Sequence, residues 1–206
     1  MESAQRPGEH LIINITGEKV ALGPLRRDLV PLYLQWINDF EVTRTLGIGI
    51  RPATLESEEA WYDATTRKQG VVDFTAYELP GLRPIGNAGL HGINHEHRTA
   101  GLGIMVGAKD CWGKGYGTEI VSLVLDYGFT VLGLHNIMLG VYSYNERAIR
   151  VYNRAGFRLV GRRRQAWRLG GEAYDVIYMD CLASEFQSRV LRRLLPEGPA
   201  SQAGGS

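Results

Sequence analysis

The sequence predicts an α+β fold, in which a mixed β-sheet carries helices on its faces. Three strand-like segments follow one another between residues 71 and 106. Helix and strand patterns then alternate through most of the remaining chain. Strands in series favour antiparallel pairs, whereas a helix between two strands allows a parallel crossover, so we expect the sheet to contain both kinds of pair.

The first part of the chain predicts a short hairpin followed by two helices. Leu11–Asn14 and Lys19–Leu22 flank a Thr-Gly pair and are interpreted as the two short strands. A segment that opens at Asp28 repeats apolar residues at helical spacing as far as Trp36. Glu56–Lys68 is rich in Ala, Glu and Lys and is the second expected helix.

Three strands of an antiparallel meander are expected next. They cover Val71–Leu79, Pro84–Ile93 and Thr99–Val106. Pro80-Gly81 joins the first two, and a polar segment at residues 94–98 joins the last two. Both connections have the composition of turns, and such short turns join neighbouring antiparallel strands.

A helix, a strand and a second helix follow. Thr118–Val131 places its apolar residues on one face and is predicted to form a central helix. Ile137–Tyr142 alternates as a strand does. Ser143 with Glu146 three residues later has the spacing of a capping box, and Gly156 stands where the helix should end.

The last part of the chain predicts a long hairpin and a final helix. Arg158–Leu169 and Ala173–Leu182 meet at a Gly-Gly pair. Gln187–Leu195 has an amphipathic pattern; this helix most simply packs on the domain, although it could also pair with a second copy as a homodimer. We expect one domain over residues 11–195 and flexible segments at 1–10 and 196–206, which lack periodicity and are rich in small or polar residues.

The composition excludes several classes of protein. A formal net charge of +1 over 206 residues gives no overall field that would attract nucleic acid or a membrane. Apolar runs stay far below the roughly 18 residues of a membrane span, and Met1–Gly8 lacks a signal-peptide pattern, so a cytoplasmic protein is expected. Cys111 and Cys181 form no C-x-x-C pair and lie near no plausible cluster of histidine ligands, so no metal site is expected.

The most informative segment is the glycine-rich loop Trp112-Gly-Lys-Gly-Tyr-Gly-Thr118, at the start of the predicted central helix. Helix N-termini present unpaired N–H groups that suit phosphate oxygens, and glycines let the backbone approach an anion closely. The spacing is not G-x-x-x-x-G-K-[ST], and its third glycine falls one residue early for G-x-G-x-x-G. The loop therefore indicates a pyrophosphate site of another type, the alternative being a turn that merely ends a strand.

Three segments together resemble the GNAT superfamily of N-acetyltransferases. They are Gly103–Val106, the glycine-rich loop, and the run Ser143-Tyr-Asn-Glu-Arg-Ala-Ile-Arg-Val-Tyr-Asn-Arg-Ala-Gly-Phe157. Tyr33–Asp39 and Gly170–Val176 are similar to the RimJ/RimL branch, which includes acetyltransferases for protein N-termini. The resemblance implies the acyl-CoA N-acyltransferase fold, with a mostly antiparallel sheet of about seven strands flanked by helices.

The resemblance also implies where acetyl-CoA binds. It would lie where two neighbouring parallel strands splay, one ending at Val106 and the other at Tyr142. Backbone groups of Met105 and Val106 would pair with the pantetheine arm as an added strand would. The family commonly has Gln or Arg where Trp112 stands, so that anchoring side chain is absent here. The pyrophosphate would be held by Gly113, Lys114, Gly115, Tyr116, Gly117 and Thr118.

Asn145 and Tyr152 are seven residues apart and therefore share one face of a helix. By resemblance, Asn145 would hydrogen-bond the pantetheine and Tyr152 would act as the general acid that protonates the leaving thiolate. A phenol with a pKa of about 10 is a sensible donor to a thiolate of similar basicity. The alternative is that Tyr152 is a core aromatic residue and Asn145 a helix cap.

No catalytic base stands where the resemblance would place it. Related proteins often carry Glu at the place of Gly101, so His91 and Glu96, on or beside the preceding strand, are the candidate bases, directly or through a water. Each is also an ordinary surface or turn residue. An α-amino group is neutral roughly one time in ten at pH 7 and a lysine-like amine roughly one time in 2,500, so a protein N-terminus needs a base least.

The acceptor pocket is the least defined part of the site. By resemblance, Trp36 and Asn38 would lie in one of its walls, although Trp36 also fits the apolar stripe of its helix. A basic patch near the last hairpin is either a solvated strand end or a surface that attracts an acidic acceptor or nucleotide phosphates. The patch consists of Arg162, Arg163, Arg164 and Arg168.

We therefore expect transfer of the acetyl group of acetyl-CoA to a primary amine, by direct attack in a ternary complex. A protein N-terminal α-amine is one acceptor; amino acids, polyamines and amine-bearing antibiotics remain open. A covalent route through Cys111 has no adjacent His or Asp to support it. A non-catalytic acyl-CoA sensor or a nucleotide-binding regulatory domain would also explain the loop, although Tyr152 argues against the sensor.

Overall fold

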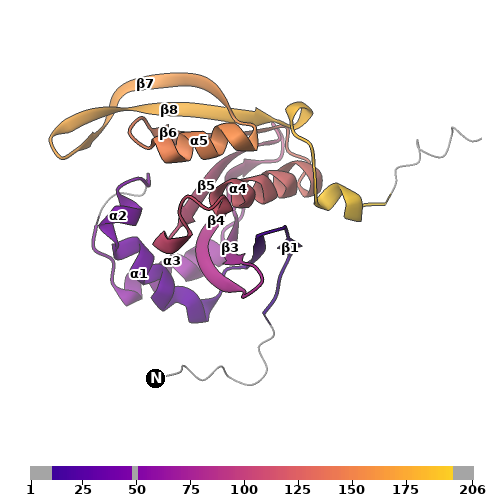
Figure 1. Ribbon diagram of the computed structural model, residues 1–206, viewed down its shortest axis with the longest axis horizontal. Helices are drawn as coiled ribbons and strands as arrows, with labels where there is room; N and C mark the ends of the chain where they lie inside the picture. The colour runs from indigo at the N-terminus through magenta and orange to yellow at the C-terminus, as the bar shows by residue number, and fades with distance from the viewer. Residues whose placement is uncertain (1–10, 48–50, 197–206) are drawn as a thin grey trace, which may run out of the picture.

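The computed structural model describes residues 11–47 and 51–196, so the two terminal segments expected to be flexible lie outside the described residues, apart from Pro196. Short 3-10 turns are labelled η, and η3 is a π-helical turn that continues α4. In chain order (Figure 1) the elements are β1 (Ile15–Thr16), β2 (Val20–Pro24), η1 (Arg27–Leu29), α1 (Val30–Asn38), α2 (Phe40–Thr43), α3 (Leu55–Arg67), β3 (Val72–Glu78), β4 (Arg83–Asn94), β5 (Thr99–Val106), η2 (Lys109–Cys111), α4 (Tyr116–Asp126), η3 (Tyr127–Val131), β6 (Asn136–Tyr142), α5 (Glu146–Ala155), β7 (Arg158–Leu169), β8 (Glu172–Leu182), η4 (Ala183–Glu185) and η5 (Leu191–Leu194).

The described strands form one eight-stranded sheet in the order β1-β2-β3-β4-β5-β6-β8-β7. β5 and β6 pair in parallel, and the other neighbouring strands pair antiparallel. The predicted mixed, mostly antiparallel sheet is thus confirmed. Its eight strands equal the strand segments expected along the chain and exceed by one the number of about seven that the resemblance implies.

The sheet divides between β5 and β6. These strands pair only over Thr99–Gly101 and Asn136–Met138. Beyond that point β5 stays paired with β4 as far as Val106, and β6 stays paired with β8 as far as Tyr142. Because each strand follows its other neighbour, the ends of β5 and β6 separate and leave unpaired backbone, which we call the β5–β6 split.

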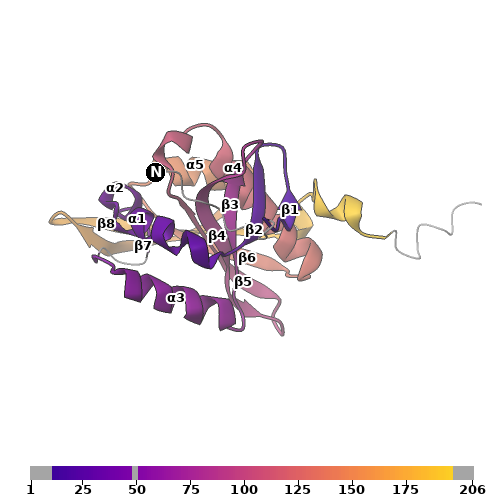
Figure 2. The same cartoon turned by 90° about the horizontal axis from the view of Figure 1, so that it is seen from below.

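Helices cover both faces of the sheet. α4 buries Ile120, Val121 and Val124 against the face of β4 and β5 that carries Leu90 and Leu102. α1 packs Tyr33 and Trp36 on the opposite face, next to Met105 of β5. Figure 2 shows α3 and α4 on opposite sides of the central strands. The β5–β6 split therefore opens toward two different helical layers.

Three local expectations were wrong, each for a tertiary reason. Gln187–Leu195 forms only the short turn η5, because the buried Asp126 carboxylate accepts hydrogen bonds from two backbone N–H groups of this segment and holds it in a non-helical path. The first strand lies at Ile15–Thr16 rather than at residues 11–14, since its pairing register with β2 begins there. Ser143 does not cap α5, because it still pairs with Asp175 of β8 as an extension of the sheet.

Candidate active site

The glycine-rich loop presents free backbone donors at the start of α4. Gly113 and Gly115 have φ angles of 79° and 91°, in the left-handed region that favours glycine, and Gly115 is the N-cap of the helix. Within the described part of the chain, the N–H groups of Gly113, Lys114 and Gly115 donate to no other group. These donors and the positive end of the helix dipole form a cradle that suits a pyrophosphate.

Lys19 lies beside this loop and adds a second cation to Lys114; the sequence did not indicate it as a site residue. The Glu119 carboxylate of α4 accepts hydrogen bonds from the backbone N–H groups of Glu18 and Lys19, at 2.5 and 2.9 Å. This contact holds Lys19 so that its ammonium nitrogen would lie 3.7 Å from a Cβ built on Gly115. No local pattern could have indicated it, since Lys19 reaches the loop from a turn about a hundred residues away in the sequence.

Trp112, which stands where the family commonly has Gln or Arg, connects the loop to the split. Its indole N–H donates a hydrogen bond of 2.8 Å to the carbonyl of Val106 at the end of β5. The guanidinium of Arg147, from the first turn of α5, lies 3.8 Å from the centre of the Trp112 ring. A positive charge is therefore brought to this position by a cation–π contact rather than by the residue at position 112 itself.

Asn145 and Tyr152 lie on α5 as the sequence pattern predicts, but Asn145 is also the N-cap of that helix. Its side-chain oxygen accepts a hydrogen bond of 3.2 Å from the N–H of Ala148. The oxygen is thus occupied in a cap, and the amide N–H₂ group is the part that remains for a ligand.

Tyr152 is buried, with 8% of its surface exposed, and packs edge-on against Phe157 at 5.8 Å between ring centres. Burial raises the pKa of its phenol to about 12. Among the described residues its hydroxyl has no hydrogen-bond partner. A phenol in this state keeps its proton at neutral pH and has it free to donate.

His91 occupies the space that a side chain at Gly101 would take. The two residues are partners across β4 and β5, and a Cβ built on Gly101 would lie 2.4 Å from Nε2 of His91. The imidazole also reaches within 3.9 Å of a Cβ built on Gly103, where the β5–β6 split has begun. Glu96 is exposed in the turn between β4 and β5, ahead of the paired part of β5.

Asp73 was not expected from the sequence and lies on the same face as His91. Its carboxylate covers Gly89, where a built Cβ would meet Oδ1 at 2.2 Å. Burial raises the pKa of this carboxyl, and the charge of His91 acts in the opposite direction. Glycines 89 and 101 thus allow a carboxylate and an imidazole to lie flat on the sheet beside the split, an arrangement that depends on cross-strand register.

The residues expected in the acceptor wall have mainly structural contacts. Trp36 is buried, and its ring would lie 2.1 Å from a Cβ built on Gly107, just beyond the end of β5. The Asn38 amide bonds the backbone of Ala53 and the carbonyl of Leu34, so it fixes the chain after α1. Substrate contact by either residue stays a prediction.

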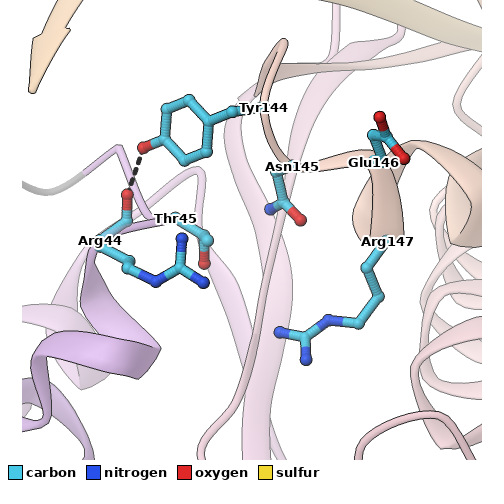
Figure 3. A pocket seen from close by; sticks show the side chains of 6 residues that line it. All are labelled: Arg44, Thr45, Tyr144, Asn145, Glu146 and Arg147. Carbon is cyan, nitrogen blue, oxygen red and sulfur yellow. Dashed lines mark hydrogen bonds between the residues drawn. The ribbon is translucent and has the colours of Figure 1, made fainter. Parts of the chain in front are cut away.

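A pocket of about 220 Å³ lies between the end of α2 and the start of α5 (Figure 3). The Tyr144 hydroxyl donates a hydrogen bond to the carbonyl of Arg44, and the Tyr142 hydroxyl donates one of 3.5 Å to Leu46. Tyr142 stacks on Trp167 of β7 at 4.5 Å between ring centres. The end of β6 is thereby joined to the segment after α2. The pocket is lined by Arg44, Thr45, Tyr144, Asn145, Glu146 and Arg147.

Cys111 is a poor nucleophile in this structure. It is 2% exposed, and burial raises the pKa of its thiol, so the reactive thiolate is disfavoured. In the part of the chain that the structure describes, no group of three or more His, Cys, Asp or Glu side chains could hold a metal ion. The described helices include none that is long and apolar enough to cross a membrane.

Comparison with known proteins gives matches of three kinds. A model of the family described as "Acetyltransferase (GNAT) domain" matches residues 19–158. The spermidine N(1)-acetyltransferase of Escherichia coli K12 is 38% identical over 87 residues, which are 42% of this chain and 46% of that protein. The match thus spans about half the length of that relative. The human alpha/beta-tubulin-N-acetyltransferase 9 is 32% identical over 158 residues, covering 71% of this chain and 75% of that protein.

A similar solved structure covers more of the chain. It is the spermidine N-acetyltransferase from Vibrio cholerae in complex with CoA and spermine, with a TM-score of 0.75 and 26% identity. The similarity covers 81% of this chain and 97% of that one.

Proposed function

Because the chain belongs to the GNAT acetyltransferase family, we propose that it transfers the acetyl group of acetyl-CoA to a primary amine. The superfamily predicted from the sequence is thereby confirmed, and the RimJ/RimL branch stays a prediction. The observation that carries the proposal is the combination of a free-donor loop at the start of α4 with the β5–β6 split, beside which the His91 imidazole lies on the sheet. Tyr152 is buried on α5, which packs against α4.

The residues present fit acetyl-CoA. Phosphate groups would bind the N–H groups of Gly113–Gly117 and the hydroxyl of Thr118, whose own N–H donates to the Gly115 carbonyl, with Lys114 and Lys19 supplying charge. The pantetheine arm would lie in the β5–β6 split, against the backbone of Met105 and Val106 and the amide of Asn145. The Val106 carbonyl already accepts a hydrogen bond from Trp112. The pantetheine arm would therefore bind the second lone pair of this carbonyl or the backbone N–H of Val106. When bound, acetyl-CoA supplies an activated acyl group and a thiol leaving group.

The catalytic groups proposed for the reaction lie in different layers. His91 and Asp73 lie on the sheet face that carries α1 and α3, whereas Tyr152 belongs to α5, which packs against α4. An amine that enters beside His91 would therefore reach the thioester from one side, and Tyr152 would protonate the sulfur from the other. Such a separation keeps the proton acceptor and the proton donor from neutralising each other.

We favour His91 over Glu96 as the base. The imidazole covers Gly101 and approaches Gly103, next to the point where β5 and β6 separate. Glu96 lies in the exposed turn before β5, on the paired side of the split. The charge of Asp73 would stabilise the protonated form of this imidazole.

Two classes of acceptor have support from relatives. One relative is a spermidine acetyltransferase, and the other is a tubulin N-acetyltransferase. A protein N-terminal α-amine has a lower pKa than a polyamine, so it needs a weaker base to lose its proton. It is therefore our preferred acceptor class, and a polyamine is the alternative. An acyl-CoA sensor without activity is disfavoured. Such a protein would need neither the proton donor Tyr152 nor an imidazole placed over Gly101 beside the split.

The proposal is tested by incubating the protein with acetyl-CoA and a panel of N-terminal peptides, amino acids and polyamines. Release of free thiol and a mass increase of one acetyl group on an amine are expected. Binding of CoA with no acetylated product across the panel would support the sensor instead. A stable acetyl label on Cys111 in the absence of amine would contradict direct attack.

A further inference from the structure

Two arginines in the pocket of Figure 3 have no anionic partner within the described residues. Arg44 closes α2, and Arg147 lies in the first turn of α5. The guanidinium groups point toward each other from opposite sides of the pocket (Figure 3). Neither forms an ion pair with a described carboxylate. Two like charges that face each other across a pocket favour binding of an anion between them.

The electrostatics of Arg147 agree with this picture. Its pKa is lowered, first by burial, then by the charge of Arg44, while Glu41 acts weakly in the opposite direction. The two positive charges thus interact directly. Binding of an anion would offset the repulsion between the two arginines and compensate the desolvation of Arg147 by charge attraction.

The carboxylates that could neutralise the pocket are already paired. Lys109 binds Asp39 at 2.8 Å and Glu41 at 3.0 Å. Glu146, which lines the pocket, pairs with Arg150 one turn along α5 at 3.3 Å. Asp39 and Glu41 share the single charge of Lys109, so this wall keeps one negative charge, whereas Glu146 is balanced by Arg150. With Arg44 and Arg147 counted, four cations stand against three carboxylates, and the region keeps a small positive excess.

Arg44 is held in place through its backbone. The Tyr144 hydroxyl bonds its carbonyl, and Tyr144 in turn packs edge-on against Tyr174 of β8 at 4.6 Å between ring centres. The backbone of Arg44 is thereby fixed relative to the start of α5, which keeps its side chain on this side of the pocket.

We propose that the amine acceptor carries an anionic group, a carboxylate or a phosphate, which Arg44 and Arg147 bind together. The inference rests on the proposed acetyl transfer and narrows its acceptor to an anionic amine such as an acidic N-terminal peptide, an amino acid or an amino phosphate. Planar guanidinium groups bind both carboxylates and phosphates through paired hydrogen bonds. A polyamine would instead add like charge to this pocket.

The same chemistry could come from a second source, the phosphates of CoA. Arg147 stacks on Trp112 next to the phosphate loop, so its removal should affect both ligands. Arg44 belongs to the helical layer of α1 and α2 and makes no contact with the loop. Arg44→Gln is therefore the variant that separates an acceptor anion from a CoA phosphate.

The experiment compares acceptors with and without an anionic group. The amidated dipeptides Ala-Asp and Ala-Asn form one pair, 2-aminoethyl phosphate and ethanolamine the other, with spermidine as the cationic reference. Values of kcat/KM are measured for the natural protein, Arg44→Gln and Arg44→Glu. Arg154→Gln is the matched control, because Arg154 is an exposed arginine near the other end of α5. Calorimetry measures CoA affinity, and then the binding of 2-aminoethyl phosphate to the CoA-saturated protein.

We expect the anionic member of each pair to be preferred, and Arg44→Gln to reduce its kcat/KM about 10- to 100-fold without changing the neutral member. Arg44→Glu should shift preference toward spermidine, and CoA affinity should stay constant. Equal use of both members, or loss of CoA affinity in Arg44→Gln with an unchanged preference, would overturn the inference. If no amine is acetylated, the proposed function fails, and calorimetric binding that depends on Arg44 still decides whether the anion site exists.

Discussion

Replacement of Tyr152 by Phe should separate activity from stability. The side chain is buried, but its hydroxyl has no hydrogen-bond partner among the described residues and is not one of their fully buried polar atoms, so its loss should change the free energy of unfolding by no more than about 1 kcal/mol. Removal of a general acid lowers turnover by about 100- to 10,000-fold, or about 2.7 to 5.4 kcal/mol in activation free energy. The variant should thus be as stable as the natural protein and nearly inactive.

The assay follows thiol release at saturating acetyl-CoA, and calorimetry follows CoA affinity. Only kcat should fall, because the phenol acts on the leaving thiolate rather than on the bound ground state. Tyr127→Phe is the control. Tyr127 of η3 packs against Phe74 of β3 and lies outside the proposed catalytic site. Unchanged turnover in Tyr152→Phe would refute the acid role, and so would a loss of CoA affinity equal to the loss of turnover.

Four further substitutions test other parts of the account. Gly101→Ala places a Cβ 2.4 Å from the His91 imidazole and should lower kcat at least about tenfold with unchanged CoA affinity by calorimetry; unchanged kcat would argue against the base. Gly115→Ala strains a φ of 91°, costs about 1 kcal/mol, and should weaken CoA binding and lower the melting temperature by about 2–4 °C. Asp126→Ala leaves one buried and one partly buried N–H group without an acceptor and should cost about 2–4 kcal/mol in denaturant unfolding, and a loss below 1 kcal/mol would contradict that role. Burial raises the pKa of Asp73, so its charged form opposes folding above that pKa; Asp73→Asn should stabilise the protein at neutral pH, with a gain that shrinks toward about pH 4, and a gain that grows on acidification would contradict this reasoning.

The sequence predicted those features that local patterns determine. The apolar stripe of α4, the three-stranded meander and the two terminal hairpin strands follow from periodicity and turn residues, and all are present. The phosphate loop is likewise local, since closely spaced glycines before a helix define it. The helix of Asn145 and Tyr152 was expected for the same reason.

Features that depend on cross-strand register were not accessible from the sequence. Asp73 approaches His91 only because β3, β4 and β5 align two glycines under their side chains. Lys19 reaches the phosphate loop through a contact with Glu119 that spans about a hundred residues. Local rules also failed where tertiary partners compete with them, as when Asp126 holds the C-terminal segment out of a helix.

The central claim is that acetyl-CoA lies in the β5–β6 split with its sulfur between Tyr152 and the face that carries His91. A crystal structure of the protein with CoA tests it most directly. We predict phosphates on the N–H groups of Gly113–Gly117, and a sulfur within about 3 Å of the Tyr152 hydroxyl. CoA bound elsewhere, or a sulfur beyond the reach of Tyr152, would contradict the account.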